Sequence, residues 1–235
     1  MPTLPAKMPP IVSADLDRYW GPVTASIDWC ELNYATTPYI AEFYNTVSSL
    51  CIVLAGCIGL AMVCPLRYKV AFACIAVVGL GSAMFHMTLL KQWQASDEVP
   101  MLYSALSYLY ILLVQDRLGA KQSRYVAIAM VCYSVFTTLL VTLTTGPLQF
   151  YLFHASFAPT ELYCLYRVYY KKSKYTRIGF TAYSVALVCW FCDFWTCETV
   201  QFHALWHFFV SIGLYCISLA LLDNEPKAAL KNKKA

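Results

Sequence analysis

Long apolar segments alternate with short polar segments along most of this chain. The apolar segments lie at about 40–64, 68–90, 99–116, 124–143, 147–170, 176–198 and 203–222. Each approaches the roughly 20 residues that a helix needs to cross about 30 Å of hydrocarbon. A helix also satisfies its own backbone hydrogen bonds, which a membrane interior requires. The pattern therefore predicts an all-α integral membrane bundle of seven transmembrane helices.

The composition supports a membrane-embedded chain. Hydrophobic residues make up 60% of the 235 positions and charged residues 13%, whereas soluble domains average roughly half and a quarter. The net charge of +4 is spread between apolar segments rather than gathered on one basic face. We therefore expect no nucleic-acid partner. Most of the cysteines, such as Cys51 and Cys132, lie inside apolar segments, where a cysteine behaves as a small hydrophobe.

The distribution of lysine and arginine predicts the orientation of the helices. Cytoplasmic loops are enriched in these residues. With seven helices, all but Lys7, Arg18 and Lys91 of the 17 basic residues fall on one side of the membrane. We therefore expect a lumenal or extracellular N-terminus and a cytoplasmic C-terminus.

This topology divides the chain into three parts. Residues 1–39 form a lumenal segment, residues 40–222 the transmembrane domain and residues 223–235 a basic cytoplasmic tail. In that tail, Lys231 and Lys233 resemble a dilysine signal for retrieval to the endoplasmic reticulum. Contact with anionic lipid is the alternative role for these lysines. We expect the protein in the endoplasmic reticulum or the Golgi, with its active site toward the lumen.

Three histidines fall at the same predicted membrane face. His203 and His207 are four residues apart, so a helix presents both imidazoles on one side. His86 lies at the same depth, near the end of the second helix. Three imidazoles with one position left for water match the open coordination of catalytic zinc. A single histidine is more often a packed core residue, but the convergence of three favours a metal site.

Two further polar residues lie near this predicted metal site. Asp97 is eleven residues beyond His86, across a short turn, where a general base that orients water fits. The alternative is that Ser96 or Asp97 caps the third helix. Ser82 is one turn before His86 on the same helix face, where its hydroxyl can donate to an oxyanion. Its alternative role is a hydrogen bond to its own helix backbone.

A second polar group precedes the first helix. Asp28, Glu31, Asn33 and Glu42 offer several oxygen donors within fifteen residues, and oxygen is the donor that Ca²⁺ prefers. Their spacing does not follow the twelve-residue EF-hand loop. Spacing alone therefore favours an ordinary acidic lumenal loop.

Two ionisable residues of the fifth helix lie outside the predicted metal site. His154 has no partner evident in the sequence, and we interpret it as structural. Glu161 lies farther toward the cytoplasm, where it can pair with Arg167 or serve another role.

Six sequence motifs carry a family resemblance. They are YWGP at 19–22, DWCELNY at 28–34, IAEFYNTVS at 40–48, GLGSAMFHMTL at 79–89, DEVPM at 97–101 and QFHALWH at 201–207. In this order the motifs resemble the alkaline ceramidases, part of a superfamily of seven-helix membrane hydrolases that includes adiponectin-receptor-like proteins. The resemblance spans most of the chain, from Tyr19 to about Tyr215.

The resemblance implies roles for the residues of the predicted metal site. It implies that zinc is held by His86, His203 and His207. It also implies that Asp97 assists the attacking water and that Ser82 assists at the oxyanion.

The resemblance also raises two expectations for the lumenal segment. It implies a Ca²⁺ site formed by Asp28, the backbone carbonyl of Trp29, Glu31, Asn33 and Glu42. It further implies a lumenal disulfide, for which Cys30 and Cys197 are the matching candidates.

The function that the resemblance implies is hydrolysis of the amide bond of ceramide, dihydroceramide or phytoceramide. Zn²⁺ would be the catalytic cofactor and Ca²⁺ a structural or regulatory one. The lipid substrate would enter from the bilayer, and we expect no obligate protein partner. Two alternatives stay open: a receptor of the adiponectin-receptor type that keeps the metal site, and a metal transporter. A transporter needs polar residues that continue through the membrane, for which Glu161 is the main candidate.

Overall fold

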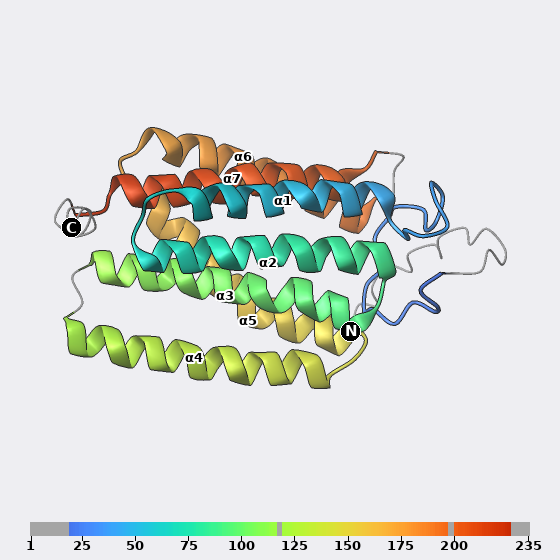
Figure 1. Ribbon diagram of the computed structural model, residues 1–235, viewed down its shortest axis with the longest axis horizontal. Helices are drawn as coiled ribbons and strands as arrows, with labels where there is room; N and C mark the ends of the chain where they lie inside the picture. Colours follow the sequence, from blue (N-terminus) through green and yellow to red (C-terminus); the bar gives the residue numbers. More distant parts are fainter. Residues whose placement is uncertain (1–18, 117–118, 197–199, 227–235) are drawn as a thin grey trace.

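The computed structural model describes residues 19–116, 119–196 and 200–226, which form seven helices and no strand. The helices are α1 (Phe43–Ala61), α2 (Leu66–Thr88), α3 (Lys91–Gln115), α4 (Ala120–Leu143), α5 (Pro147–Tyr169), α6 (Lys174–Trp195) and α7 (Phe202–Asp223). Consecutive helices run in opposite directions along one bundle (Figure 1). Residues 1–18 and 227–235, which include much of the predicted lumenal segment and tail, lie outside the described residues.

Local residue chemistry sets several of the helix ends. Helix α5 begins with Pro147 after Gly146, because proline is suited to the first helical position, where no backbone N–H is needed. Ser173 caps α6 by accepting the backbone N–H of Tyr175. Helix α2 ends at Leu89, whose φ of 54° is left-handed.

The predicted start of the third helix is wrong. This helix begins at Lys91 rather than near residue 99, and Pro100 lies inside it. Most of residues 91–98 are polar, so the apolar pattern excluded this stretch. Gln94 and Glu98 are nevertheless buried and bonded to each other, so their polarity belongs to the bundle interior rather than to a loop.

Helix α2 lies at the centre of the bundle. Its Tyr68, Phe72 and Ile75 are fully buried and pack in one core with residues of α1, α3, α5, α6 and α7. A Cβ added at Gly79 would lie 2.5 Å from the backbone nitrogen of Val53, so α1 and α2 approach backbone to backbone. Small residues permit such close packing between membrane helices.

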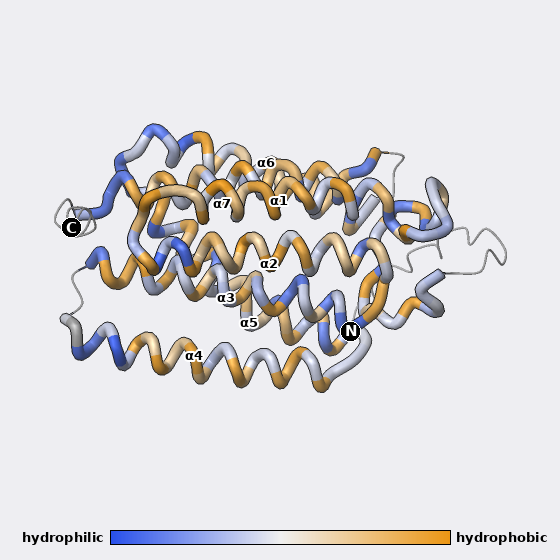
Figure 2. The backbone as a smooth tube through the Cα atoms, viewed as in Figure 1, coloured by the Kyte–Doolittle hydropathy of each residue, from blue (hydrophilic) through white to orange (hydrophobic). Residues whose placement is uncertain are grey.

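Hydrophobic residues occur along the length of the helices (Figure 2), and many of the large ones are exposed on the bundle. Five helices are long and apolar enough to cross a membrane: α1, α2, α4 from Lys121, α6 and α7. Apolar side chains that point away from a protein core need a hydrocarbon environment. The helical, membrane-embedded character predicted from the sequence is confirmed at this level.

The chain preceding α1 covers one end of the bundle, which we call the histidine end. Ala41 and Glu42 donate backbone hydrogen bonds to the carbonyls of Met87 (3.0 Å) and His86 (2.9 Å). Trp29 and Ala41 pack against Phe85 and Leu89 at the end of α2 in a small separate core. The segment before α1 is therefore held against the end of α2 on which His86 lies.

Candidate active site

The three predicted histidines meet at the histidine end. His86 is in the last turn of α2, and His203 and His207 are in the first two turns of α7. All three are buried, and one nitrogen of each lies within 4.8 Å of the others. Small side-chain shifts reconcile this spacing with Zn–N bonds of about 2.0–2.1 Å. The group can therefore hold a metal ion.

The Glu42 carboxylate holds one ring nitrogen of His86. His86 Nδ1 donates to Glu42 Oε2, and Glu42 Oε1 accepts the backbone N–H of Trp29 at 3.0 Å. Asn45 Nδ2 also donates to Glu42 Oε2 at 3.1 Å. His86 Nε2 is buried and has no hydrogen-bond partner among the described residues. A ring held by a carboxylate through one nitrogen and open at the other has the arrangement of a metal ligand.

Serines of α1 and α2 surround the His207 ring. Ser48 Oγ lies 2.9 Å from His207 Nδ1, and Ser82 Oγ lies 3.3 Å from Nε2. Ser49 Oγ is 3.0 Å from Ser82 Oγ. Sequence analysis placed Ser82 here but missed Ser48 and Ser49. Their spacing in the sequence could have predicted them, because both are about one helical turn beyond Asn45, which also faces the site.

Two indole rings enclose His203. Trp29 stacks on it with ring centroids 3.9 Å apart and planes at 25°, and Trp206 lies at 5.2 Å and 26°. Trp206 is on the same helix, whereas Trp29 comes from the segment before α1. The sequence predicted a role only for the Trp29 carbonyl, yet its ring forms a wall of the site.

Asp97 lies within α3 rather than at its first residue, so the helix-cap alternative for Ser96 or Asp97 is wrong. A Cβ added at Gly81 would be 2.0 Å from the Ser96 carbonyl oxygen and 2.8 Å from the Asp97 nitrogen. Because Gly81 precedes Ser82, this close approach sets the Asp97 backbone beside α2. No described group donates a hydrogen bond to the Asp97 carboxylate. Its role in proton transfer stays a prediction.

The comparison with known proteins decides the family. Residues 21–225 match the family model described as Ceramidase. An alkaline ceramidase of Arabidopsis thaliana is 33% identical over 226 residues, covering 88% of this chain and 86% of its own length. Alkaline ceramidase 3 of Mus musculus is 31% identical over 226 residues, with coverage of 86% and 85%. The chain belongs to the ceramidase family.

Membership of the ceramidase family confirms the resemblance seen in the sequence motifs. It also supports the interpretation as a hydrolase over the alternatives of a receptor and a transporter. The matched range includes all three histidines, Asp97, Ser82 and the oxygen-rich residues before α1.

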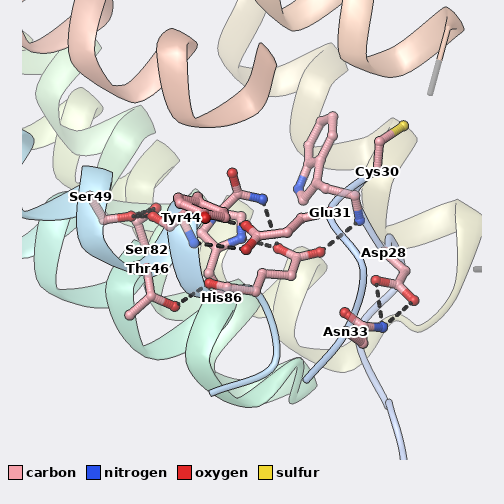
Figure 3. Close-up of polar contacts among 12 residues, drawn as sticks. Asp28, Cys30, Glu31, Asn33, Tyr44, Thr46, Ser49, Ser82 and His86 are labelled. Atoms are coloured by element: carbon pink, nitrogen blue, oxygen red, sulfur yellow. Dashed lines mark hydrogen bonds and ion pairs between the residues drawn. The ribbon is translucent and has the colours of Figure 1, made fainter. Parts of the chain in front are cut away.

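Three of the oxygen donors predicted before α1, Asp28, Glu31 and Asn33, are drawn in Figure 3, where Asp28 and Asn33 point toward each other. Asn33 Nδ2 donates to both carboxylate oxygens of Asp28, at 3.2 and 3.0 Å. Glu31 is buried and accepts the backbone N–H groups of Tyr44 (2.7 Å) and Asn45 (2.9 Å). Burial raises the pKa of the Glu31 carboxyl to about 7, although these two donors act in the opposite direction.

Only one of the two cysteines in the predicted Cys30–Cys197 disulfide is among the described residues. Cys30 is disulfide-bonded and its backbone N–H donates to Asp193 Oδ2 at 3.3 Å. Cys197 lies outside the described residues. The pairing of these two cysteines therefore stays a prediction.

A buried amide and carboxylate group that the sequence analysis missed lies next to Asp97. Gln94 Nε2 donates to Glu98 Oε1 at 2.7 Å and to Ser26 Oγ at 2.6 Å. Gln149 Nε2 of α5 is 3.5 Å from Glu98 Oε2. The group therefore connects the segment before α1 with α3 and α5.

The two ionisable residues of α5 have local partners. His154 Nδ1 donates to the Phe150 carbonyl at 2.8 Å, which agrees with a structural role. Glu161 is buried, and the Tyr183 side chain is among the groups near its carboxylate. The suggested Glu161 pair with Arg167 is wrong, because Arg167 extends to Asp116 at 2.6 Å instead.

Proposed function

We propose that this protein hydrolyses the amide bond of ceramide-type lipids at a zinc ion held by His86, His203 and His207. The observation that carries the proposal is the buried group of three imidazoles, in which His86 is oriented by Glu42 and keeps Nε2 without a hydrogen-bond partner in the described chain. The ceramidases to which the chain is similar supply the reaction class.

The neighbouring side chains fit the demands of amide hydrolysis. Zn²⁺, when bound, supplies a Lewis acid that acidifies water and polarises a carbonyl oxygen. Glu42 and Ser48 hold the rings of His86 and His207 in place. Ser82 donates a hydrogen bond to the substrate carbonyl oxygen as negative charge develops on it.

Asp97 carries the proton. It accepts a proton from the attacking water while the water oxygen bonds to the carbonyl carbon. It then delivers that proton to the amide nitrogen as the C–N bond breaks, because an unprotonated amine anion is a poor leaving group. The products are a free sphingoid base and a fatty acid, and Asp97 returns to its starting state.

The bundle is proposed to cross the membrane seven times, with the histidine end in the lumen. Helices α3 and α5 have 25 and 23 residues, or about 37 and 34 Å at 1.5 Å per residue. Their polar residues Glu98, Gln149 and Glu161 are buried in the bundle, so hydrocarbon does not meet them. The distribution of lysine and arginine supports the orientation. The endoplasmic reticulum or Golgi stays the predicted compartment.

A Ca²⁺ site is proposed at Asp28, the Trp29 carbonyl, Glu31, Asn33 and Glu42. Asn33 Oδ1 is buried and accepts no hydrogen bond from the described residues, although a cation would satisfy it. Oxygen donors of this kind suit Ca²⁺. Because Glu42 also bonds to His86, a cation there would stabilise the carboxylate that orients a zinc ligand.

The proposed reaction is tested with purified protein and ceramide, by measuring the sphingoid base and the fatty acid released. Equal amounts of the two products are expected. Ser82→Ala should lower kcat by about 100-fold or more, as for loss of one oxyanion donor. The matched control is Ser211→Ala on α7, whose hydroxyl bonds only to its own helix, at the Phe208 carbonyl (2.7 Å). Equal kcat values for Ser82→Ala and the wild type would contradict the role of Ser82.

Calcium is tested separately from zinc. Activity should fall with a calcium-selective chelator and recover when Ca²⁺ is added, and Asn33→Ala should weaken this response. Activity that responds neither to the chelator nor to Asn33→Ala would contradict the calcium site and leave the zinc proposal intact.

A further inference from the structure

Helix α4 packs loosely against the rest of the bundle. Within its membrane-length window 11% of the residues are buried, against 56% for α2. Hydroxyl pairs tie it to α3, with Tyr110 Oη 2.7 Å from Ser123 Oγ and Tyr103 Oη 2.5 Å from Thr138 Oγ1. Figure 1 shows α4 at the edge of the bundle. A groove of about 670 Å³ lies between α4, α2 and α3.

The groove is about as long as the hydrocarbon part of one leaflet is thick. Its lining extends from Leu66 to Cys74 on α2 and from Tyr103 to Val114 on α3, which is about 12 and 17 Å at 1.5 Å per residue. Half of a hydrocarbon core of about 30 Å is about 15 Å. Most of the lining is apolar, and the volume is typical of pockets for lipid-sized molecules, roughly 300–1,000 Å³. An acyl chain from the leaflet at that end fits these dimensions.

The end of the groove at Ser123, which we call its mouth, is near the start of α4 and lies at the end of the bundle opposite the histidines. Lys121 and Arg124 are exposed in the first turns of α4, on either side of the groove residue Ser123. Neither forms an ion pair with a carboxylate of the described residues. Arg67 also lines the groove, and its guanidinium pairs with Glu225 while its Nε is buried without a described partner. Two uncompensated cations remain at the mouth.

We propose that one anionic glycerophospholipid occupies this groove, with an acyl chain between α2, α3 and α4 and its phosphate at Lys121 and Arg124. Basic pockets between membrane helices recognise anionic headgroups in this way, and the backbone N–H groups at the start of α4 add to the attraction. The lipid would supply the packing that α4 lacks. The site is independent of the zinc chemistry and does not rest on the proposed reaction.

The headgroup contact is tested by native mass spectrometry of the full chain. The protein is purified from nanodiscs that contain equal amounts of dioleoylphosphatidylserine, dioleoylphosphatidylcholine and ceramide, and the retained lipids are counted. The wild type is expected to retain one phosphatidylserine. Replacing both Lys121 and Arg124 by Gln should lower this preference about 30-fold, since each basic residue contributes about fivefold. Lys172 is an exposed lysine just after α5, and the control variant Lys172→Gln should leave the preference for phosphatidylserine unchanged.

The acyl contact is tested by filling the groove. Ala127 lines it, whereas the next residue, Ile128, is 53% exposed on the outside of α4. The Ala127→Trp variant should no longer retain phospholipid, because the indole would fill the groove. The Ile128→Trp variant should retain it, and circular dichroism should show equal helix content in both variants.

Three outcomes would overturn the proposal. They are equal retention of the two phospholipids by the wild type, phosphatidylserine retained in full by Ala127→Trp, and ceramide retained in place of phospholipid. The last outcome would make the groove a substrate site. Each result is a binding measurement, so it is independent of whether the protein hydrolyses ceramide.

Discussion

The two ends of the bundle hold buried polar residues in different ways. At the histidine end three imidazoles face one another, and His86 Nε2 has no hydrogen-bond partner in the described chain. At the opposite end unlike groups face one another across α2, α3 and the chain after α7. Arg67 pairs with Glu225, the Tyr68 hydroxyl donates to Glu225 at 2.6 Å, and Gln115 donates to the Tyr68 oxygen at 2.9 Å.

This difference is what we expect if the histidine end is a ligand site and the contacts at the opposite end are structural. At the opposite end each donor faces an acceptor, because a cation lies beside a carboxylate and a hydroxyl beside an amide. Such pairs satisfy one another's hydrogen bonds, and they contribute to the stability of the fold. At the histidine end His86 Nε2 has no described hydrogen-bond partner, and an ion held by the three converging imidazoles would complete the group. Substitutions at the histidine end should therefore change activity, and those at the opposite end should change stability.

The largest expected effect is from His207→Ala. Removing a zinc ligand should lower kcat/KM for ceramide by about a thousandfold or more, equivalent to several kcal/mol of transition-state stabilisation. Steady-state kinetics of the purified variant measure this loss. A decrease of less than about tenfold would contradict the assignment of His207.

The next effect is from Glu42→Gln, which weakens the contact that orients His86. Metal affinity or activity should fall about 10- to 100-fold, as is typical when the hydrogen-bond partner of a metal ligand is changed. Competition with a chelator measures the affinity. The matched variant Glu225→Gln alters a buried glutamate at the other end and should leave metal affinity unchanged; equal losses in both variants would remove the distinction between the ends.

Glu225→Gln should instead destabilise the fold. We expect a loss of about 2 kcal/mol, within the range for a hydrogen bond to a charged group, because Arg67 is partly exposed and keeps some solvation. Thermal unfolding in detergent, with activity per folded molecule measured alongside, gives both quantities. An unchanged Tm would show that this contact contributes nothing measurable.

The smallest effect is from Tyr68→Phe, which removes one hydroxyl and leaves the ring in the core. The hydroxyl takes part in two hydrogen bonds, to Glu225 and from Gln115. Glu225 keeps Arg67 and Gln115 as donors without it, so the loss should cost about 1 kcal/mol of stability, with kcat/KM unchanged. The same unfolding assay detects the shift. A decrease in kcat/KM with normal stability would mean that the opposite end takes part in the reaction.

The helices and the histidines were accessible from the sequence because both depend on local spacing. Seven apolar segments predicted seven helices, and the four-residue spacing of His203 and His207 predicted a shared face. The start of α3 was missed because Gln94 and Glu98 are polar yet point into the bundle. Spacing carries no information about such inward polar groups.

Contacts between segments that are distant in the sequence could not be predicted in the same way. Arg67 and Glu225 are 158 positions apart, and so are Ser49 and His207. Arg167 was one suggested partner of Glu161 because the two are close in sequence, although the Arg167 guanidinium pairs with Asp116 instead. Glu42 resembled an oxygen ligand by type, and its bond to His86 appeared only with the fold.

Metal content is the most direct test of the central claim that the three histidines hold catalytic zinc. Purified wild-type protein should contain one zinc ion per chain by elemental analysis, and its activity should fall and recover in proportion to zinc removed and restored. His86→Ala and His203→Ala should each contain less than about a tenth of that zinc, with the Tm measured to confirm folding. Full zinc occupancy in both folded variants, or full activity of metal-free wild type, would contradict the account.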